Sequence, residues 1–356
     1  AQAMLPRFFA NPNAHHMLGY EIDSLMQNSR KKIADCFGFD VQEVFFTASG
    51  SEAVNLAIKG IAIANQHIGK HIITVATEHH CALNSMTWLH TWFGHEITML
   101  SVDRKGKIDL QQLQNSIRQD TVMVVIMAVN NEIATIHPIP AIQQLLKQKK
   151  SKAVLVVDAI AAVGKIDPSL YKADVMAFSQ HKLGGISGSG CLLKRRHIKM
   201  EPLISGGQQE QSKRAGTPFA IANILFGDVI THAIEKQRQK HDHMVSLRDH
   251  LIEQLCERFN VTIVSDQQGS PYIVSFIQPR VHSSIILNVL SQQEVFVSSH
   301  SACASDLKIP SHVLMACGYR PEEAFGMIRV SFHYHTSKAD IDGFIAAYEK
   351  VSEYVQ

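Results

Sequence analysis

Short apolar runs alternate with helical patterns between about residues 40 and 200, and this alternation constrains the fold more than any other feature. Runs such as Val154–Val157 and Val175–Phe178 are apolar throughout, as expected for strands buried on both faces. The predicted strands are 44–46, 71–75, 97–100, 122–128, 153–158, 173–178 and 190–194, and the predicted helices between them are 51–65, 80–92, 109–117 and 139–149. This order predicts an α/β fold, with a mostly parallel sheet covered by helices on both faces. Ligands of such folds bind beyond the carboxyl ends of the strands.

The pattern changes after about residue 218. A charge-rich helical pattern continues to about residue 259, and we expect a break within it. Beyond it the predicted strands are 261–264, 272–277, 294–298 and 327–332, and the predicted helices are 283–290, 310–316 and 338–352. The sequence therefore predicts a large domain at 1–233 and a smaller α+β domain at 234–356.

Composition excludes several classes of protein. A net charge of +2 over 356 residues provides no basic field for nucleic acid, and no apolar run reaches transmembrane length. The first residues lack the pattern of a secretory signal. Twenty histidines form no HExxH motif and no Cys/His cluster at zinc spacing, so no metal site is predicted. The cysteines are scattered without a CxxC motif, which favours a reducing cytoplasm. They are Cys36, Cys81, Cys191, Cys256, Cys303 and Cys317.

Asp158 closes the predicted strand 153–158, and Lys182 follows the predicted strand 173–178. A carboxylate and a lysine at neighbouring strand ends are what a pyridoxal phosphate (PLP) site requires. The lysine forms the Schiff base, and the aspartate keeps the pyridinium nitrogen protonated. Taken singly, Asp158 fits a helix N-cap or a metal ligand, and Lys182 fits a solvated side chain. Their combination favours PLP.

Small and polar residues at 47–53 predict a phosphate-binding turn. Gly50 and Ser51 open a helix after the strand at 44–46, where free backbone N–H groups bind anions. The simpler alternative is a helix N-cap made by Ser49 or Ser51. Ser179, His181 and Thr217 are further candidate donors to the same phosphate, although Thr217 precedes Pro218 and fits a turn equally well.

Two more strand ends carry candidate ligands. His79 follows the strand at 71–75, where an imidazole can stack on a flat cofactor ring or simply cap the next helix. Asn131 follows the strand at 122–128, where its amide can bind a ring hydroxyl or a substrate carboxylate. The run Asn130-Asn131-Glu132 is also common turn chemistry.

Cys303 and Arg329 are candidates for contacts with a substrate. Cys303 lies in a small, polar segment at 297–305, unlike a buried structural cysteine, so it is the cysteine that we expect to be reactive. Arg329 lies in an alternating strand, from which a guanidinium can bind an α-carboxylate with two hydrogen bonds. A surface or salt-bridged arginine fits the same pattern.

Together these residues resemble the NifS/IscS-type cysteine desulfurases, which are class V PLP enzymes of aminotransferase fold type I. The matching segments keep the family order and cover nearly the whole chain. They are Asn11-Pro12, Asn55 to Gly60, Thr77 to His79, Val129 to Ile133, Asp158-Ala159, Ser179 to Lys182, Arg214 to Thr217, Ser298 to Cys303, and Ile328-Arg329.

The resemblance implies a fold and a role for each candidate. The fold would be a large domain with a mostly parallel seven-stranded sheet and a smaller C-terminal domain carrying a mobile cysteine loop. Lys182 would hold PLP, Asp158 would bind its ring nitrogen, and His79 would stack on the ring and move protons. The phosphate would be held by Gly50, Ser51, Ser179 and His181, with Thr217 from the second subunit of a homodimer. Asn131 and Arg329 would bind cysteine, with Asn131 also near the cofactor, and Cys303 would take the sulfur as a persulfide.

The chain departs from the family pattern at several positions. Ala161 replaces the glutamine that bonds the cofactor's ring oxygen, and His300 stands where glycine is usual. Residues 184–188 read Gly-Gly-Ile-Ser-Gly in place of Tyr-Gly-Pro-Lys-Gly. The family's opening strand and Ala-Thr-Thr-Pro turn do not occur, because of either residues before position 1 or a shorter start.

These observations predict a cytoplasmic, homodimeric, PLP-dependent cysteine desulfurase. It would convert L-cysteine to L-alanine and pass sulfur to an iron–sulfur scaffold or a thiolation protein, with neither a nucleic acid nor a membrane as partner. Two alternatives stay open. One is a selenocysteine lyase or another class V lyase. The other is an impaired paralogue that acts as a binding or regulatory subunit, as Ala161 allows.

Overall fold

The computed structural model describes residues 10–299 and 309–353. These residues group into two compact units. The first comprises the chain up to Leu100, Leu110–Ala128 and Pro138–Glu235, and the second comprises Ser101–Asp109, Val129–His137 and the chain from Lys236 onward. The domain division at residues 233 and 234 stays a prediction.

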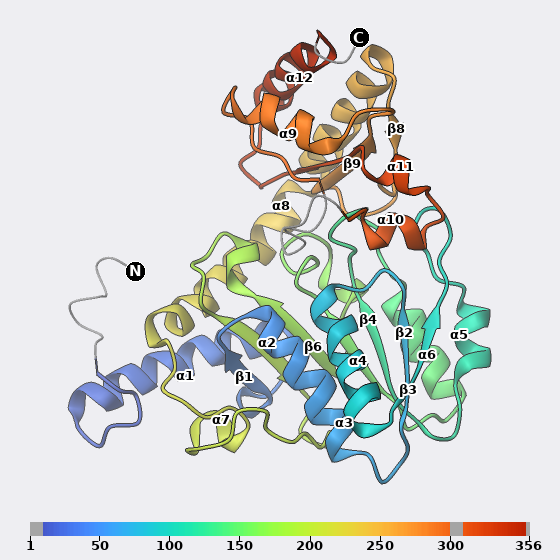
Figure 1. The fold of residues 1–356 in the computed structure, drawn as a ribbon. Helices are drawn as coiled ribbons and strands as arrows, with labels where there is room; N and C mark the ends of the chain where they lie inside the picture. The colour runs from blue at the N-terminus through green and yellow to red at the C-terminus, as the bar shows by residue number, and fades with distance from the viewer. Residues whose placement is uncertain (1–9, 300–308, 354–356) are drawn as a thin grey trace. The chain divides into compact units, whose positions relative to one another are not determined.

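A seven-stranded sheet lies at the centre of the first unit (Figure 1), in the order β1-β7-β6-β5-β4-β2-β3. Its strands are β1 (Val44–Thr47), β2 (His71–Val75), β3 (Glu96–Leu100), β4 (Thr121–Met127), β5 (Val154–Asp158), β6 (Val175–Ser179) and β7 (Gly190–Lys194). The strands from β6 to β3 pair in parallel, whereas β7 is antiparallel to β1 and β6. The predicted α/β class with a mostly parallel sheet is confirmed.

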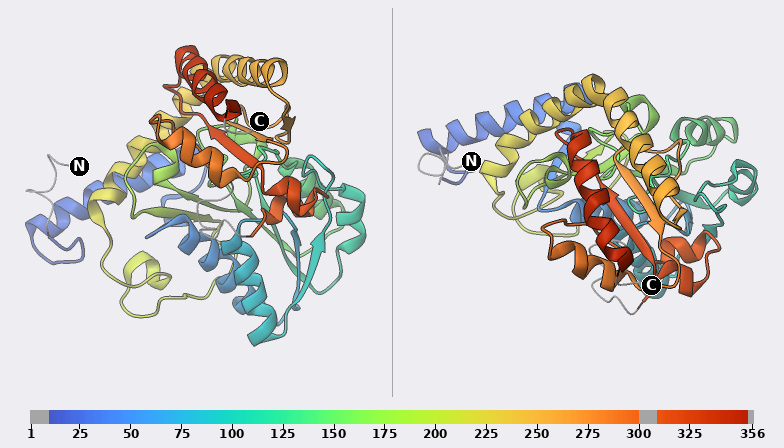
Figure 2. Two further views of the ribbon diagram at one scale, coloured as in Figure 1. Left: turned by 45° about the horizontal axis from the view of Figure 1, so that its top comes forward. Right: turned by 90° about the horizontal axis from the view of Figure 1, so that it is seen from above.

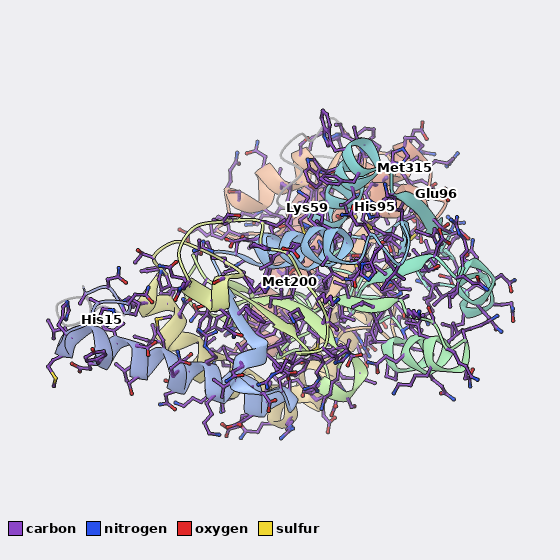
Figure 3. The ribbon with its side chains drawn as sticks, turned by 90° about the horizontal axis from the view of Figure 1, so that it is seen from below. His15, Lys59, His95, Glu96, Met200 and Met315 are labelled. Atoms are coloured by element: carbon purple, nitrogen blue, oxygen red, sulfur yellow. The ribbon has the colours of Figure 1, made fainter. Side chains whose placement is uncertain are left out.

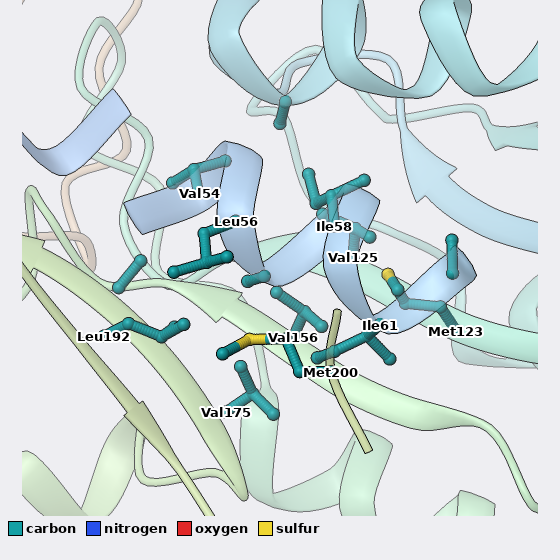
Figure 4. Close-up of a cluster of buried hydrophobic side chains, with 14 of the residues drawn as sticks. Val54, Leu56, Ile58, Ile61, Met123, Val125, Val156, Val175, Leu192 and Met200 are labelled. Carbon is teal, nitrogen blue, oxygen red and sulfur yellow. The ribbon is translucent and has the colours of Figure 1, made fainter. Parts of the chain in front are cut away.

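One face of this sheet is covered by α2 (Gly50–Asn55), a π-helical turn (Leu56–Gly60), α3 (Ile61–Ala64) and α4 (His80–Phe93). In Figure 4, Leu56 and Ile61 lie over Val156 and Met200 in the cluster that joins these helices to the sheet. Each such side chain contributes about 1.5–3 kcal/mol when fully buried. This core fixes the start of α2 at the carboxyl edge of the sheet.

The opposite face is covered by α1 (Met17–Phe37) and the start of α8 (Ala220–Arg258). Phe178 of β6 contacts Phe37 of α1 and Phe226 of α8, with ring centroids 5.5 and 5.7 Å apart. Helix α1 ends at Phe37 and is capped by Gly38, whose φ of 65° suits a residue without a side chain. No element was predicted before residue 44, so α1 is an addition to the predicted fold.

The remaining helices of the first unit are α5 (Leu110–Ser116), α6 (Ile139–Gln148) and the short α7 (Gln209–Ser212). Strand β3 is one of the two edge strands of this sheet, and His95 and Glu96 lie together at its start (Figure 3). Glu96 accepts a hydrogen bond of 2.5 Å from Arg118. Charged side chains on an edge strand disfavour pairing with another chain.

A three-stranded antiparallel sheet forms the framework of the second unit, in the order β10-β9-β8. Its strands are β8 (Thr262–Ile263), β9 (Ile273–Ile277) and β10 (Met327–Ser331), and its helices are α9 (Ser283–Ser291), α10 (His312–Ala316), α11 (Pro321–Ala324) and α12 (Lys338–Glu353). Side chains from α9, α12 and the second half of α8 share one core with the sheet. The ribbon in Figure 2 shows these helices beside the strands. This arrangement agrees with the predicted α+β character.

Two local predictions are wrong. The long helix α8 runs from Ala220 to Arg258 without the expected break, and no proline occurs within it. The predicted strand 294–298 is reduced to a single bridge between Ser298 and Arg329. Glu294 has a φ of 59°, which is incompatible with an extended strand. Among the residues described, no helix is both long enough and apolar enough to cross a membrane.

Candidate active site

Asp158 is the last residue of β5, and only 5% of it is exposed. Its backbone oxygen accepts a bond of 2.8 Å from the N–H of Ala128, and its Oδ1 accepts a bond of 2.9 Å from the N–H of Ile160. Burial raises the pKa of Asp158 to about 6, although the bond from Ile160 opposes this shift. The carboxylate is therefore placed where a cationic ligand would stabilise it.

Lys182 lies in the 3-10 turn Gln180–Leu183, which directly follows β6. Because β5 and β6 are neighbours in the sheet, this turn starts beside the strand end that carries Asp158. Lys182 is exposed. Burial, followed by repulsion from Lys182, lowers the pKa of Lys165 to about 8. A positive charge on Lys182 is therefore felt by a second lysine close to the same edge.

The candidate phosphate ligands lie around the start of α2. The Ser179 hydroxyl and His181 Nδ1 are 2.7 Å apart. Burial and the charge of Lys182 lower the pKa of His181. A Cβ on Gly50 would lie 2.5 Å from Ile160 Cδ1 and 3.1 Å from Ser179 Cβ, so a larger residue there would require Ile160 to shift. Ser51 is exposed on the first turn of α2.

The cap of α2 is Ser49, whose hydroxyl accepts a bond of 3.1 Å from the N–H of Glu52. The N-cap interpretation therefore applies to Ser49 rather than to Ser51. Glu52 also accepts a bond from Arg214 at 2.7 Å, which ties the segment 214–217 to the same helix start. Thr217 is exposed and lines a cavity of about 130 Å³ together with Thr47.

His79 is the N-cap of α4 at the end of β2. Its Nδ1 accepts a bond of 3.1 Å from the N–H of Cys81, so in the neutral ring the proton belongs on Nε2. Cys81 Sγ lies at the same distance, 3.1 Å, from this nitrogen. The predicted capping alternative is thus what the backbone shows, and it fixes the direction of the imidazole.

Arg329 and Asn131 both belong to the second unit. Arg329 Nη1 donates a bond of 2.9 Å to the backbone oxygen of Asn131. Burial lowers the pKa of Arg329, whereas the carboxylate of Glu132 opposes this shift. Among the described residues, none accepts a hydrogen bond from the buried Nε of Arg329. The guanidinium therefore retains a donor for an anionic ligand.

Cys303 lies outside the described residues, and so does His300. Of the cysteines that are described, Cys191 and Cys317 are buried, and burial raises the pKa of Cys317 to about 12. Such thiols are unreactive at neutral pH. The prediction that the reactive thiol is Cys303 stays a prediction.

Sequence reasoning missed Glu78, a fully buried carboxyl beside Asp158. Burial and the charge of Asp158 raise the pKa of Glu78 well above its usual value. The available signal was the motif Thr77-Glu78-His79, in which a carboxylate lies shortly after a buried strand. Lys165 was missed as well, because nothing in its sequence spacing indicates that it lies near Lys182.

These residues fit PLP. The buried Asp158 matches a protonated ring nitrogen, because a cation there would offset the cost of an isolated buried carboxylate. Gly50, the first residue of α2, approaches Ser179 closely, and free N–H groups at a helix start can bind a phosphate. Ala161 offers no hydrogen bond to a ring oxygen. PLP would thus be held by Asp158, Lys182 and the residues around Gly50.

A family model described as "Aminotransferase class-V" matches residues 1–344. The chain belongs to the class V aminotransferase family. It is 35% identical over 361 residues to "Cysteine desulfurase IscS" of Methanosarcina thermophila, covering 100% of this chain and 88% of that protein. This confirms the resemblance to NifS/IscS-type proteins, whose family typically uses PLP.

Solved structures of this family agree with the fold. The structure named "NIFS-LIKE PROTEIN" has a TM-score of 0.91 and 29% identity, and the match covers 99% of this chain and 94% of that chain. The structure named "SspA in complex with cysteine" has a TM-score of 0.79 and 28% identity, and the match covers 95% and 96% of the two chains.

Proposed function

We propose that this class V protein is a PLP-dependent cysteine desulfurase that converts L-cysteine to L-alanine and forms a persulfide on Cys303. The observation that carries the proposal is the buried carboxylate of Asp158 at the end of β5, beside the strand that leads to Lys182. The match to cysteine desulfurases over the whole chain supports the choice of substrate. We further propose a cytoplasmic homodimer that passes sulfur to an iron–sulfur scaffold or a thiolation protein.

Holding the cofactor would be the work of the first unit. Asp158 would keep the ring nitrogen protonated, and His79 would cover one face of the ring from its fixed position as the cap of α4. Ser51, Ser179 and His181 would bind the phosphate with the N–H groups near Gly50, and the partner subunit's Thr217 would complete the phosphate site. When bound, PLP supplies an electron sink for the substrate's Cα.

The proton transfers would fall to Lys182 and His79. Lys182 Nζ would take the proton from the substrate's Cα and return a proton to the carbon frame. His79 would carry its neutral-ring proton on Nε2, because its Nδ1 accepts the N–H of Cys81. That leaves Nε2 as the nitrogen that can exchange a proton with the substrate.

Substrate binding would use Arg329 and Asn131. The Nε of Arg329 has no acceptor among the described residues, and a carboxylate is the ligand that a guanidinium prefers. Asn131 would contribute its side-chain amide, while its backbone oxygen orients Arg329 through the bond of 2.9 Å.

Sulfur transfer would take place on Cys303. Its thiolate would attack the sulfur of the bound cysteine, so that a new S–S bond forms and the substrate's C–S bond breaks. The electron pair of the broken bond stays with the substrate's Cβ side. The resulting three-carbon product takes up a proton and leaves as alanine. The persulfide sulfur is then available to an acceptor thiol.

The test is cysteine turnover measured as alanine, together with mass spectrometry of the protein. We expect alanine formation and a mass increase of one sulfur atom on Cys303, both lost in Cys303→Ala and kept in the control Cys256→Ala. Cys256 is a suitable control because it is exposed and unassigned. Release of sulfide from cysteine by Cys303→Ala at the wild-type rate would refute the persulfide role, and preferred turnover of selenocysteine would favour the lyase alternative.

Ala161 keeps the impaired paralogue as a second candidate, because the chain lacks one hydrogen bond expected at the cofactor. Borohydride reduction after addition of PLP separates the two. The enzyme requires a reduced adduct on Lys182. A protein that shows no visible absorption band and no adduct would be a binding or regulatory subunit.

A further inference from the structure

Glu78 bridges two strand ends at the edge where Asp158 lies. It follows β2 and is completely buried, with 0% exposure. Its Oε1 accepts a bond of 2.5 Å from the N–H of Met127, the last residue of β4. Met127 is in turn the register partner of Asp158 on β5. Since the sheet order is β5-β4-β2, the carboxyl groups of Glu78 and Asp158 flank one strand end.

Two carboxyl groups in such a place cannot both be charged at low cost. Burial opposes ionisation of each, and two like charges close together oppose it further. Burial is the largest cause that raises the pKa of Glu78, and the charge of Asp158 is the next. The pKa of Asp158, raised to about 6, still leaves it ionised at neutral pH. The environments of the two groups thus push their titrations apart, as in known acid/base pairs.

We propose that Glu78 is held as a neutral carboxylic acid, so that the pair presents a single negative charge on Asp158 to the cofactor's ring nitrogen. Glu78 would be a positioning residue. Its Oε1 accepts the N–H of Met127 and so holds the end of β4 in register with Asp158. Because Glu78 is neutral, it adds no second negative charge that would raise the pKa of Asp158 further. The neutral state of Glu78 concerns the chain alone. Its effect on the cofactor's ring nitrogen rests on the proposed function.

Infrared spectroscopy of the protein labelled with ¹³C at its glutamate carboxyl groups tests the neutral state directly. We expect an isotope-shifted C=O band of a protonated acid at pH 7, with and without PLP. The band should disappear in Glu78→Gln and persist in Glu132→Gln. Glu132 is the matched control because it is also buried, at 1% exposure, and accepts a bond from Ser311. A wild-type spectrum without this band would overturn the proposal, even if no variant folds.

Cofactor affinity tests the purpose. Glu78→Gln and Asp158→Asn are the same isosteric change, but glutamine mimics a neutral acid whereas asparagine removes the charge. We expect the dissociation constant of PLP to rise about 100-fold in Asp158→Asn, about 2.7 kcal/mol, and far less in Glu78→Gln. Equal losses would mean that Glu78 is also charged and would overturn the proposal. If no variant and no wild-type protein bound PLP, the proposed function would fail while the infrared band still decided the state of Glu78.

Discussion

The edge of β1 and the carboxyl end of β5 both bury charged groups, but protein atoms compensate them to different degrees. At β1, Arg30 donates two bonds to Glu210, at 2.8 and 2.9 Å, and a third to the backbone oxygen of Val44. Glu210 also accepts the N–H of Phe46 at 2.9 Å. The guanidinium of Arg30 and the carboxylate of Glu210 thus both have protein partners.

At β5, protein groups compensate the negative charge of Asp158 only in part. Asp158 accepts the N–H of Ile160, but the buried carboxyl of Glu78, whose pKa the charge of Asp158 helps to raise, offers it no opposite charge. Breaking a buried ion pair whose two partners both come from the protein destabilises the folded state. A buried carboxylate without an opposite charge instead indicates where a cationic ligand binds. Within one sheet, the charged groups at β1 therefore stabilise the fold, whereas the carboxylate at β5 is a candidate ligand.

Removal of one partner at β1 should have the largest effect. Arg30→Met leaves Glu210 buried and unpaired, so we expect the free energy of unfolding to fall by about 3–5 kcal/mol. Denaturant unfolding measures this loss. The control is Lys31→Met, since Lys31 pairs with Asp35 at the surface, with about 60% of both side chains exposed, where such pairs contribute about 0–1 kcal/mol. Equal losses in the two variants would contradict the account.

Removal of the charge at β5 should act on the ligand rather than on the fold. In Asp158→Asn we expect PLP to dissociate about 100-fold more readily, while the stability of the cofactor-free protein stays equal or rises, because an uncompensated buried charge is gone. Absorbance titration with PLP and denaturant unfolding measure the two effects. A loss of stability as large as that of Arg30→Met would show that Asp158 is structural.

Acid should stabilise the cofactor-free protein through Asp158. Its pKa of about 6 when folded exceeds its ordinary value of 3.8, so the folded state binds the proton more tightly. The contribution of this carboxyl to stability therefore increases as the pH falls, by about 1 kcal/mol between pH 7 and pH 5. The measured quantity is the pH dependence of unfolding in wild type minus that in Asp158→Asn. This difference removes other groups, such as His137, whose lowered pKa of about 4 acts in the opposite direction.

The smallest effect concerns Ala161. Ala161→Gln restores the amide that the family pattern has there, and one net hydrogen bond contributes about 0.5–1.5 kcal/mol. We therefore expect PLP to bind about threefold more tightly, as measured by absorbance titration. Weaker binding in this variant would mean that the space beside Ala161 has been filled by other groups of this chain.

Much of the sheet could be predicted from sequence, because buried parallel strands are continuous apolar runs such as Val154–Val157. The same pattern placed Asp158 and Lys182 at the ends of strands that prove to be neighbours. The valines at 295 and 297 suggested a strand by the same logic, but the backbone at Glu294 turns away from extended geometry.

What the sequence could not show is pairing over long separations. Arg30 and Glu210 are 180 positions apart, and only the fold brings them together. Glu78 and Asp158 are separated by the whole of β4 and its flanking segments, so their electrostatic coupling could not be read from either motif. Local patterns predict elements, whereas the balance of buried charge depends on their assembly.

The most direct test of the central claim is the pKa of Asp158 itself, measured by carboxyl ¹³C NMR in the cofactor-free protein and again after loading with PLP. The account predicts a pKa of about 6 without the cofactor and a value below the ordinary 3.8 once a pyridinium cation lies beside it. A pKa of 3.8 or below in the cofactor-free protein, or a pKa that PLP leaves unchanged, would contradict the claim that Asp158 binds the protonated ring nitrogen of the cofactor.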